Sequence, residues 1–583
     1  MRKTKIICTL GPATDDKNVL RSLMKNGMNV ARLNFSHGTH ADHLVRINAV
    51  KELREELNIP VAIMLDTRGP EIRIKTFKNG TAEIVAGDTF TLTTRDIEGD
   101  SDAVSITYAD LPNELKPGSR ILIDDGLIEL EARDFTDTDI ICRVVNGGIL
   151  RNRKSINLPD THIEMAYMNE QDKADIIFGV EQDVDFIAAS FVRNVYDVLE
   201  IAKILESSGG ESTKIIAKIE NREGVNNIDE ILNVADGIMV ARGDMGVEIA
   251  REELPRIQKT LIKKCCACGK ISITATQMLE SMIKNPRPTR AEVTDIANAI
   301  YDGTSAIMLS GETAAGDHPV AAVATMARIA ETTESAIDYR HFFTDDFAKD
   351  ISVTNAISHA ACTTAVDLGA TAIITVTQSG YTARMLSKFR PYCPIIASTT
   401  SEKNFRQMAL SWGIIPARSR VCETTDDLFD TAVEIARNSG FVRDGDVVVI
   451  TGGAPVGVSG TTNLMKVHLV GNILVQGTSV TKLSASGELC VSDNMDDVMT
   501  NFHEGMILCV PKTTNAIMPI LKRCKGIICE EDGIGCHAAI VGLTLDIPVI
   551  VGAKNATKIL KNGTVITIDG TQGTVYGGTT KLI

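Results

Sequence analysis

The alternation of apolar, strand-length runs with amphipathic helices is the feature that most constrains how this chain can fold. Eight such runs occur before residue 340, three of them before residue 70 and the others after residue 170: TKIICTL, NVARLNF, VAIMLD, DFIAAS, KIIAKIE, GIMVARG, SITATQM and SAIMLSGE. Near-continuous apolar runs are typical of parallel strands that are covered on both faces. Eight strands that alternate with helices predict a closed (β/α)8 barrel, a TIM barrel, over residues 1–69 and 170–340.

Polar residues stand at the carboxyl-terminal ends of at least seven of these runs. The active site of such a barrel is built at that end, so the pattern favours the barrel over the alternative, an open doubly wound sheet. KIIAKIE alternates with a period of two, which places Ile216, Lys218 and Glu220 on one face. Asp244 ends the next run, and buried charges of this kind must pair or hold a metal.

Three further regions interrupt or follow the barrel pattern. Between residues 70 and 169, short alternating runs separated by Gly, Asp and Asn turns predict an all-β insert after the third strand. Residues 341–473 again alternate strands with helices, and residues 474–583 form a small piece rich in Val, Ile and Gly. The predicted fold class is therefore α/β, with a barrel, an all-β insert, an α/β domain and a small C-terminal domain.

The composition argues against several classes of partner. The formal net charge is −15 and 4% of the residues are aromatic, whereas a nucleic-acid surface needs basic groups and stacking aromatic rings. No apolar run is long enough to cross a bilayer, and the N-terminal MRKTKIICTLGPAT holds only a strand-length apolar piece. The thirteen cysteines are scattered and odd in number, which indicates reduced thiols. We therefore expect a cytoplasmic protein that binds neither nucleic acid nor membranes.

The ends of the second and third runs carry a further chemical signal. NVARLNFSHG presents Arg32, Asn34 and Ser36 at a spacing of two, so that they project from one face. LDTRGPEIR adds a second polar set, which comprises Asp66, Thr67, Arg68, Glu71 and Arg73. Hydroxyl, amide and carboxylate oxygens suit a hard cation, and paired arginines suit a phosphate group. The alternative is a network of ion pairs that closes the barrel rim without a ligand.

Six segments together resemble the signature segments of pyruvate kinase, in that family's order: NVARLNFSHG, LDTRGPEIR, IIAKIEN, MVARGDMGVE, ATQMLESM and IMLSGETA. The resemblance covers about residues 1–472. It implies the transfer of phosphate from phosphoenolpyruvate to ADP, which gives pyruvate and ATP. It also implies that residues 70–169 are a lid domain, that residues 341–473 are an allosteric domain, and that the chain forms a homotetramer.

The resemblance assigns roles to residues at the strand ends. Glu220 and Asp244 would hold Mg²⁺ or Mn²⁺, and Lys218 would stabilise the phosphoryl group in transfer and the developing enolate. The implied catalytic residues are Lys218, Thr276 and Arg32, and the implied substrate-binding residues are Arg32, Lys218, Gly243, Asp244 and Thr276. The implied K⁺ ligands are Asn34, Ser36, Asp66 and Thr67, and the implied nucleotide-binding residues are Asn34, His37, Arg73 and Lys154.

Three of these positions need a physical comment. Threonine is a poor general acid, so we expect Thr276 to orient a water or a proton relay, with core packing as the alternative. An acidic residue at Glu71 needs a bound cation to offset its charge, and this predicts dependence on K⁺, because K⁺-independent relatives carry lysine there. Arg68 departs from the lysine that many relatives carry, which replaces a point charge by a planar fork.

The α/β domain holds TVTQSGYTARML, a strand that runs into a helix through Thr377, Ser379, Gly380 and Thr382. Hydroxyls and free N–H groups at a helix start can bind phosphate. A second Gly-rich loop, TGGAPVGVSGTTN, follows a later strand. By resemblance, the two loops form a pocket for a phosphorylated allosteric effector, and a sugar bisphosphate, a sugar monophosphate and a nucleotide remain alternatives.

The C-terminal segment EEDGIGCHAAIVGLTLDIPVIVGA resembles the swivelling phosphohistidine domain of enzymes that use phosphoenolpyruvate. His537 is retained, but Asp532, Gly535 and Cys536 replace the usual Gly, Thr and Ser. We therefore expect a structural or interaction role for His537. Two other functions are alternatives for the whole chain: a metal-dependent lyase or aldolase that acts on pyruvate-like acids, and an inactive metabolic sensor.

Overall fold

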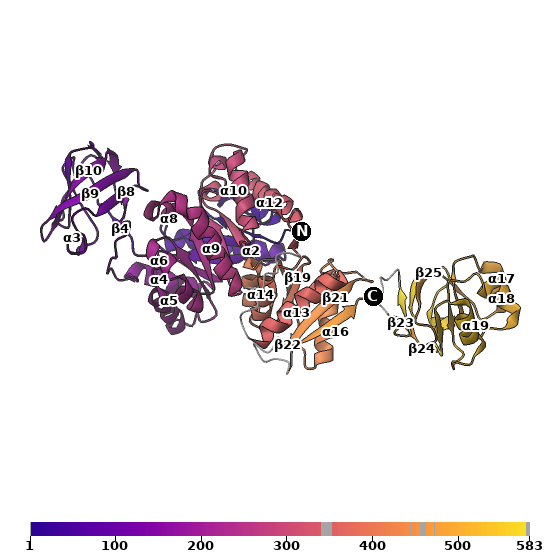
Figure 1. Ribbon diagram of the computed structural model, residues 1–583. Helices are drawn as coiled ribbons and strands as arrows, with labels where there is room; N and C mark the ends of the chain where they lie inside the picture. Colours follow the sequence, from indigo (N-terminus) through magenta and orange to yellow (C-terminus); the bar gives the residue numbers. More distant parts are fainter. Residues whose placement is uncertain (1, 340–351, 444, 455–461, 472, 579–583) are drawn as a thin grey trace. The chain divides into compact units, whose positions relative to one another are not determined.

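The computed structural model describes residues 2–339, 352–443, 445–454, 462–471 and 473–578 (Figure 1). The chain divides into two compact units, and the first contains the barrel, the all-β insert and the segments Gln378–Arg390 and Thr399–Pro416. Eight parallel strands close the barrel in the order β1-β17-β16-β15-β14-β13-β3-β2. They are β1 Lys5–Thr9, β2 Val30–Asn34, β3 Ala62–Asp66, β13 Phe186–Ala189, β14 Lys214–Ile219, β15 Gly237–Ala241, β16 Ile271–Ala275 and β17 Ala306–Leu309. The predicted closed barrel is confirmed.

Successive residues of each barrel strand pack into different cores. In β1, Ile7 belongs to the cluster inside the barrel, whereas Ile6 belongs to the larger cluster between the strands and the surrounding helices. Side chains alternate across a strand, so a strand with both faces covered must be apolar throughout. This explains why the barrel runs read as continuous apolar segments, and it leaves the strand ends as the place where polar side chains can meet.

Helices cover the outside of the barrel: α1 Lys17–Lys25, α2 His40–Glu56, α4 Glu170–Glu181, α5 Val195–Ser207, α7 Ile228–Val234, α9 Leu254–Ala267, α10 Arg290–Tyr301 and α12 Pro319–Ser335. Helix α2 begins with a capping box of Thr39 and Asp42, which satisfies backbone N–H groups of the first turn. A short helix, α6 Arg222–Asn226, follows β14. Two other short helices follow strand ends, α8 Arg242–Glu248 and α11 Gly311–Ala314.

The insert leaves the barrel after β3 and returns at α4. Its elements are β4 Ile72–Arg73, β5 Thr81–Ile84, β6 Thr89–Thr93, β7 Ala103–Ser105, α3 Leu111–Glu114, β8 Arg120–Ile123, β9 Ile128–Phe135, β10 Asp139–Asn146, β11 Gly148–Arg151 and β12 Ser155–Asn157. Seven strands form one sheet in the order β4-β12-β8-β9-β10-β6-β7, and β5 pairs with β11. The insert has its own apolar core, as expected for a separate domain.

The α/β domain comprises α13 Val353–Leu368, β18 Ala372–Val376, α14 Tyr381–Lys388, β19 Ile395–Thr399, α15 Glu402–Gln407, β20 Ile414–Arg418, α16 Thr425–Asn438, β21 Val447–Gly453 and β22 Thr462–Leu469. Its sheet has the order β20-β19-β18-β21-β22. Helix α15 carries Arg406, whose Nε donates to Asp185 Oδ1 across 2.8 Å at the start of barrel strand β13. Asp185 is fully buried, so this ion pair ties α15 to the barrel within the first unit.

The C-terminal region is built on an eight-stranded sheet in the order β23-β30-β29-β25-β26-β27-β28-β24. Its elements are β23 Ile473–Gln476, β24 Thr478–Ser479, β25 Ser484–Val491, α17 Met495–Asn501, β26 Ile507–Val510, α18 Met518–Leu521, β27 Gly526–Cys529, α19 His537–Leu545, β28 Val549–Val551, α20 Ala556–Ile559, β29 Val565–Asp569 and β30 Thr574–Gly577. Two apolar clusters lie on the faces of this sheet.

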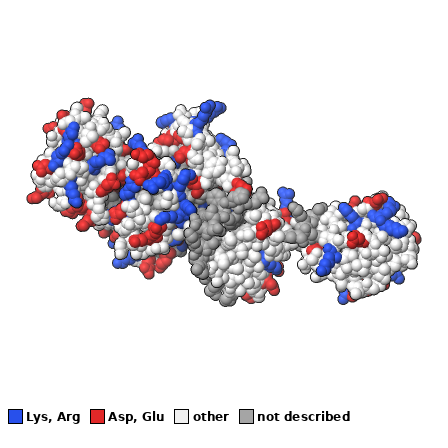
Figure 2. All heavy atoms as spheres, viewed as in Figure 1, with Lys and Arg blue, Asp and Glu red and all other residues white. Residues whose placement is uncertain are grey.

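Three properties of the whole chain complete the description. All thirteen cysteines fall within the described residues, and each is a free thiol. Among those residues, no helix is long and apolar enough to cross a membrane. On the face drawn in Figure 2, acidic and basic side chains are interspersed rather than gathered into one field.

Candidate active site

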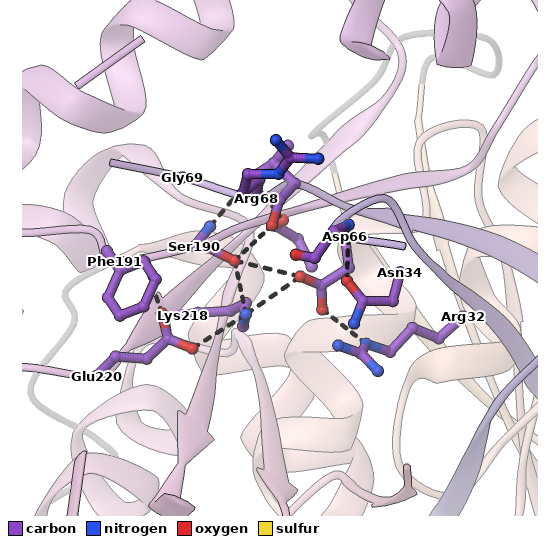
Figure 3. A network of polar contacts seen from close by, with 12 residues as sticks. Arg32, Asn34, Asp66, Arg68, Gly69, Ser190, Phe191, Lys218 and Glu220 are labelled. Atoms are coloured by element: carbon purple, nitrogen blue, oxygen red, sulfur yellow. Dashed lines mark hydrogen bonds and ion pairs between the residues drawn. The ribbon is translucent and has the colours of Figure 1, made fainter. Parts of the chain in front are cut away.

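Lys218 lies at the centre of a buried polar network at the carboxyl-terminal ends of barrel strands (Figure 3). Its Nζ is 3.1 Å from Asp66 Oδ1, 2.6 Å from Ser190 Oγ and 3.0 Å from Glu220 Oε1. These partners follow or end β3, β13 and β14, which are neighbours in the barrel. The ammonium has three N–H donors, and each has an acceptor within reach.

Burial and charge act in opposite directions on this lysine. Burial alone would lower the pKa of Lys218, but the carboxylates of Asp66 and Glu220 outweigh it and raise the pKa above its usual value. Burial alone would likewise raise the pKa of Asp66, yet the charges of Arg32 and Lys218 hold it below the usual value. Lys218 and Asp66 are therefore both charged at neutral pH.

Arg32 binds the other oxygen of the same carboxylate. Its Nε donates to Asp66 Oδ2 across 2.6 Å, and its Nη1 donates to Thr9 Oγ1 across 2.9 Å. The Thr9 hydroxyl in turn donates to Leu309 O, which fixes it from the next strand. Arg32 Nη2 has no hydrogen-bond partner among the described residues, so its N–H groups stay available for an anion.

Glu220 is fully buried, and only one of its oxygens has a well-directed donor. Oε2 accepts from the backbone N–H of Phe191 across 2.6 Å, whereas Oε1 has only its ion-pair contact with Lys218. Burial raises the pKa of Glu220, the negative charge of Asp244 adds to that rise, and Lys218 opposes it. Glu220 and Asp244 are thus close enough to repel each other, which a bound cation would relieve.

Thr276 stands immediately after β16 in the left-handed region, with φ of 72°. Its Oγ1 accepts from the N–H of Gly243 across 2.7 Å and donates to Ala275 O across 2.6 Å. The neighbouring Arg242 fixes this turn, because its Nη2 donates to Thr276 O across 2.6 Å and its Nη1 pairs with Asp295. A β-branched residue with positive φ is unusual and strained.

A cleft of about 690 Å³ lies between the insert and the barrel rim. Its lining includes His37, Arg73, Lys154 and Asp244, so the structure brings these predicted residues to one cavity. Arg73 pairs with Glu71 across 2.7 Å, and Lys154 pairs with Asp124 across 2.7 Å. Arg73 and Lys154 are therefore both neutralised by carboxylates, and a phosphate group would have to replace these carboxylates.

Comparison with known proteins shows which family this chain resembles. Residues 1–323 match the family model for the barrel domain of pyruvate kinase, and residues 355–468 match that for its alpha/beta domain. The pyruvate kinase of Sporosarcina psychrophila is 49% identical over 581 residues, which is 99% of each chain.

The chain belongs to the pyruvate kinase family.

A second pyruvate kinase, from Geobacillus stearothermophilus, is also 49% identical over 99% of each chain. Among solved structures, a pyruvate kinase from Cryptosporidium parvum superposes with a TM-score of 0.77 at 40% identity, covering 80% of this chain and 96% of that one. Residues 502–573 match the mobile domain of PEP-utilising enzymes. The resemblance inferred from the sequence segments is confirmed for both parts of the chain.

The residues assigned to a divalent cation fit such an ion. Glu220 Oε1 is buried without a well-directed hydrogen bond, and an oxygen of this kind is suited to a metal. Asp244 lines the adjacent cleft, which leaves room for further ligands. Within the described ranges, no group of three or more His, Cys, Asp or Glu side chains is arranged to hold a metal. A pair of carboxylates with open positions is what Mg²⁺ prefers when substrate oxygens complete its shell.

The oxygens assigned to K⁺ come from neighbouring strands. Asn34 and Asp66 are register partners in β2 and β3, and Thr67 follows Asp66 directly. Asn34 Oδ1 accepts from the N–H of Ser36 across 3.1 Å, which orders the loop after β2. The donor set is amide, hydroxyl and carboxylate oxygen, which suits a hard cation. Burial raises the pKa of nearby Glu71, and its ion pair with Arg73 opposes that rise.

The segment assigned to an effector joins β18 to α14. Gly380 caps α14 with φ of 72°, a conformation that favours glycine. Thr377 donates its N–H to Ser398 O across 2.9 Å. Residues 455–461 of the second Gly-rich loop lie outside the described residues.

In the C-terminal domain, His537 begins α19, and its Nδ1 and Nε2 contact Thr513 Oγ1 at 2.8 Å and Asn515 Oδ1 at 3.0 Å.

The sequence alone did not identify several residues that complete the site. Ser190 and Phe191 follow β13 and contact Lys218 and Glu220. Asp172, at the start of α4, accepts the N–H groups of Arg68 and Gly69 across 2.9 and 3.0 Å and so holds the loop after β3. Ser190 could have been found as one of the polar residues at strand ends. No local pattern points to Asp172, because its partners are more than 100 residues away.

Proposed function

We propose that this chain transfers phosphate from phosphoenolpyruvate to ADP and releases pyruvate and ATP. The observation that carries the proposal is the placement of Lys218 between Asp66 and Glu220, next to Asp244, at the ends of adjacent barrel strands. Phosphoryl transfer depends on positioning and on neutralising charge. Family membership supports the same reaction.

Arg32 and Lys218 bind the transferring phosphoryl group in this proposal. Arg32 offers Nη2, while its Nε stays bonded to Asp66. Lys218 carries its charge to the point where negative charge develops on the phosphoryl oxygens and on the enolate. Both side chains are held by buried partners before substrate arrives, so little reorganisation is needed during the reaction.

Glu220 and Asp244 would hold the divalent cation, Mg²⁺ or Mn²⁺, which would neutralise charge on the enolate and phosphoryl oxygens when bound. The Phe191 N–H orients Glu220 through Oε2 and leaves Oε1 without a directed hydrogen bond, so that Oε1 could bind the ion. Gly243 lies in the first turn of α8 beside Asp244. With no side chain there, its backbone can approach the carboxylate of the substrate closely.

Thr276 orients the proton relay to the enolate carbon in this mechanism. Its hydroxyl already donates to Ala275 O and accepts from Gly243 N–H, so both of its hydrogen-bonding roles are set by the backbone. A threonine hydroxyl does not release a proton by itself near neutral pH. We therefore assign the proton to a water that this hydroxyl positions.

ADP occupies the cleft between the insert and the barrel. Arg73 and Lys154 exchange Glu71 and Asp124 for phosphate oxygens, and His37 lies on the same cleft. Asn34, which was predicted both for the nucleotide and for K⁺, is not among the residues that line the cleft. The K⁺ assignment to Asn34, Ser36, Asp66 and Thr67 predicts activation by K⁺, with Glu71 as the acidic residue that the ion offsets.

A phosphorylated effector at Thr377, Ser379, Gly380 and Thr382 and a homotetrameric assembly complete the proposal. The strand-to-helix junction with Gly380 in the left-handed conformation supports the effector segment. The candidate effectors fall into two chemical classes, sugar phosphates and nucleotides. An activity screen against both classes identifies it, and analytical ultracentrifugation measures the assembly.

A coupled assay that follows pyruvate formation tests the reaction. The full chain should release pyruvate from phosphoenolpyruvate only when ADP and Mg²⁺ are both present, and faster with K⁺ than with Na⁺. A lyase or aldolase would release pyruvate without ADP. Absence of ADP-dependent pyruvate release with both cations present would refute the proposed function.

A further inference from the structure

Two uncharged residues, Ser190 and Phe191, each contact one member of the Lys218–Glu220 ion pair (Figure 3). Ser190 Oγ lies 2.6 Å from Lys218 Nζ, and the N–H of Phe191 donates to Glu220 Oε2 across 2.6 Å. Both residues follow strand β13. The proposed reaction gives no role to any residue of that strand. Ser190 is 1% exposed, so its hydroxyl has only protein partners.

The surroundings of Ser190 determine which way its hydrogen bonds run. A hydroxyl has one proton and two lone pairs. Ser190 Oγ lies 2.7 Å from Thr67 O and 3.2 Å from Asp66 Oδ1, and a carbonyl and an ionised carboxylate can only accept. The proton is therefore committed to one of these two oxygens, and the lone pairs of Ser190 face the ammonium of Lys218.

A neutral acceptor has a specific consequence at this place. The ammonium contacts one carboxylate oxygen of Asp66 and one of Glu220, at 3.1 and 3.0 Å. A third contact to a hydroxyl fixes the nitrogen without neutralising more of its charge. A long, flexible side chain needs such a contact, because an ion pair alone leaves a lysine free to shift between carboxylates.

Ser190 is itself held rigidly. Its N–H donates to Thr67 Oγ1 across 3.2 Å, and a Cβ added at Gly69 would lie 2.9 Å from Ser190 Cβ. Phe191 has φ of 54°, a left-handed conformation that is unfavourable for a non-glycine residue. The Phe191 N–H donates to Glu220 Oε2, so consecutive residues hold the lysine and the glutamate.

We infer that Ser190 is a positioning residue, which holds the Lys218 ammonium at one place between Asp66 and Glu220 for transfer of the phosphoryl group. Phe191 fixes Glu220 from the same turn through its backbone. The inference rests on the proposed function, because the position of Lys218 matters only if that lysine acts on the substrate.

Steady-state kinetics of full-length Ser190→Ala and Ser190→Thr test the inference. We expect kcat of Ser190→Ala to fall about 10–100-fold, because a misplacement near 1 Å can cost that much. KM for phosphoenolpyruvate should change less than about three-fold, since binding through Arg32 is retained. Ser190→Thr keeps the hydroxyl and should recover most of the lost kcat.

Ser272→Ala is the matched control. Ser272 is a fully buried serine of barrel strand β16, and its hydroxyl accepts from Ser305 N across 3.1 Å at the opposite end of the strand. Its loss should lower Tm and leave kcat unchanged. A Ser190→Ala enzyme with kcat within about two-fold of wild type overturns the inference, and so does failure of Ser190→Thr to exceed Ser190→Ala.

A fourth variant keeps the test decisive if Ser190→Ala does not fold. Ser190→Cys preserves the size of the side chain and offers only a weak acceptor, so it must lose kcat to a similar extent, and wild-type turnover contradicts the inference. An inactive wild-type enzyme would instead contradict the proposed function, which separates the two failures.

Discussion

Gly243 donates its backbone N–H to Thr276 Oγ1 across 2.7 Å, linking the first turn after β15 to the residue that follows β16. The same hydroxyl donates to Ala275 O, and Thr276 has φ of 72°. The two residues follow adjacent barrel strands, so this hydrogen bond fixes the distance between the segment that carries Asp244 and the end of β16. A strained threonine at this point is consistent with a functional constraint.

Thr276→Val removes this hydroxyl while keeping the shape of the side chain. We expect kcat to fall about 100-fold, at the lower end of the roughly 10²–10⁴-fold that a positioned proton transfer contributes. Thr276→Ser should retain most of the activity. Thr274→Val, on the same strand, removes a buried hydroxyl that donates to Thr304 Oγ1; it should lower Tm without lowering kcat. Equal kcat losses in the two valine variants would contradict the assignment.

Lys218→Met should bind phosphoenolpyruvate nearly normally and lose most of its turnover. The expected loss of kcat is about 10²–10³-fold, since the charge acts on the transition state. Isothermal titration and steady-state kinetics separate binding from turnover. Lys214→Met is the control. Lys214 is the first residue of the same strand, at the end remote from the site, and its Nζ lies 3.0 Å from Asp236 Oδ1. Wild-type turnover in Lys218→Met would refute the role of the lysine.

Glu71→Lys should remove the dependence on K⁺. The introduced ammonium supplies the charge that the ion otherwise brings, so rates in K⁺ and Na⁺ should agree within about two-fold. Because Arg73 loses its partner Glu71, KM for ADP should change as well. Glu71→Gln removes the acid without adding a cation and should remain activated by K⁺, because the four assigned ligands are retained. An unchanged K⁺ response in Glu71→Lys contradicts the proposed cation site.

His43 should make the barrel less stable in acid. Its ring stacks on Phe35 with centroids 4.0 Å apart, and its Nε2 contacts His37 O at 2.9 Å. Burial lowers the pKa of His43 below its usual 6.5, so the folded state disfavours protonation that the unfolded state accepts. The unfolding free energy should therefore fall as the pH drops through 6.5 toward the lower folded pKa.

His43→Phe keeps an aromatic ring for stacking and cannot titrate. We expect the difference between the Tm at about pH 7.5 and the Tm at about pH 5.0 to be smaller in this variant than in wild type. Differential scanning calorimetry measures both. An identical pH dependence would show that His43 does not couple folding to protonation.

Arg406→Met should destabilise the first unit strongly. Asp185 is fully buried, and its Oδ1 accepts a hydrogen bond from Arg406 Nε across 2.8 Å. The variant therefore leaves a buried carboxylate without its main cation. The expected loss is about 3–5 kcal/mol, seen as an earlier denaturant transition. Arg420→Met breaks the exposed pair with Asp427 and should leave the denaturant transition nearly unchanged, because solvent screens this pair. Equal effects would contradict the role assigned to burial.

Much of the architecture follows from local patterns. The eight apolar runs predicted the barrel because a strand covered on both faces has no position for a polar side chain except at its end. Lys218 and Glu220 were placed on one face by their spacing of two, and they form an ion pair at 3.0 Å. The signature segments then identified the family, which the comparisons confirm.

The tertiary structure decided which partners these residues have. Asp66 forms ion pairs with both Arg32 and Lys218. The Ser190 hydroxyl contacts Lys218, and Asp172 accepts a hydrogen bond from the loop after Asp66. These contacts join residues far apart in the chain, and some depend on backbone angles such as φ of 54° at Phe191. A periodic pattern reports only which face a side chain occupies. The distance between two strand ends is fixed by how the strands close into a barrel, and the sequence determines that closure only through the packing of the whole core.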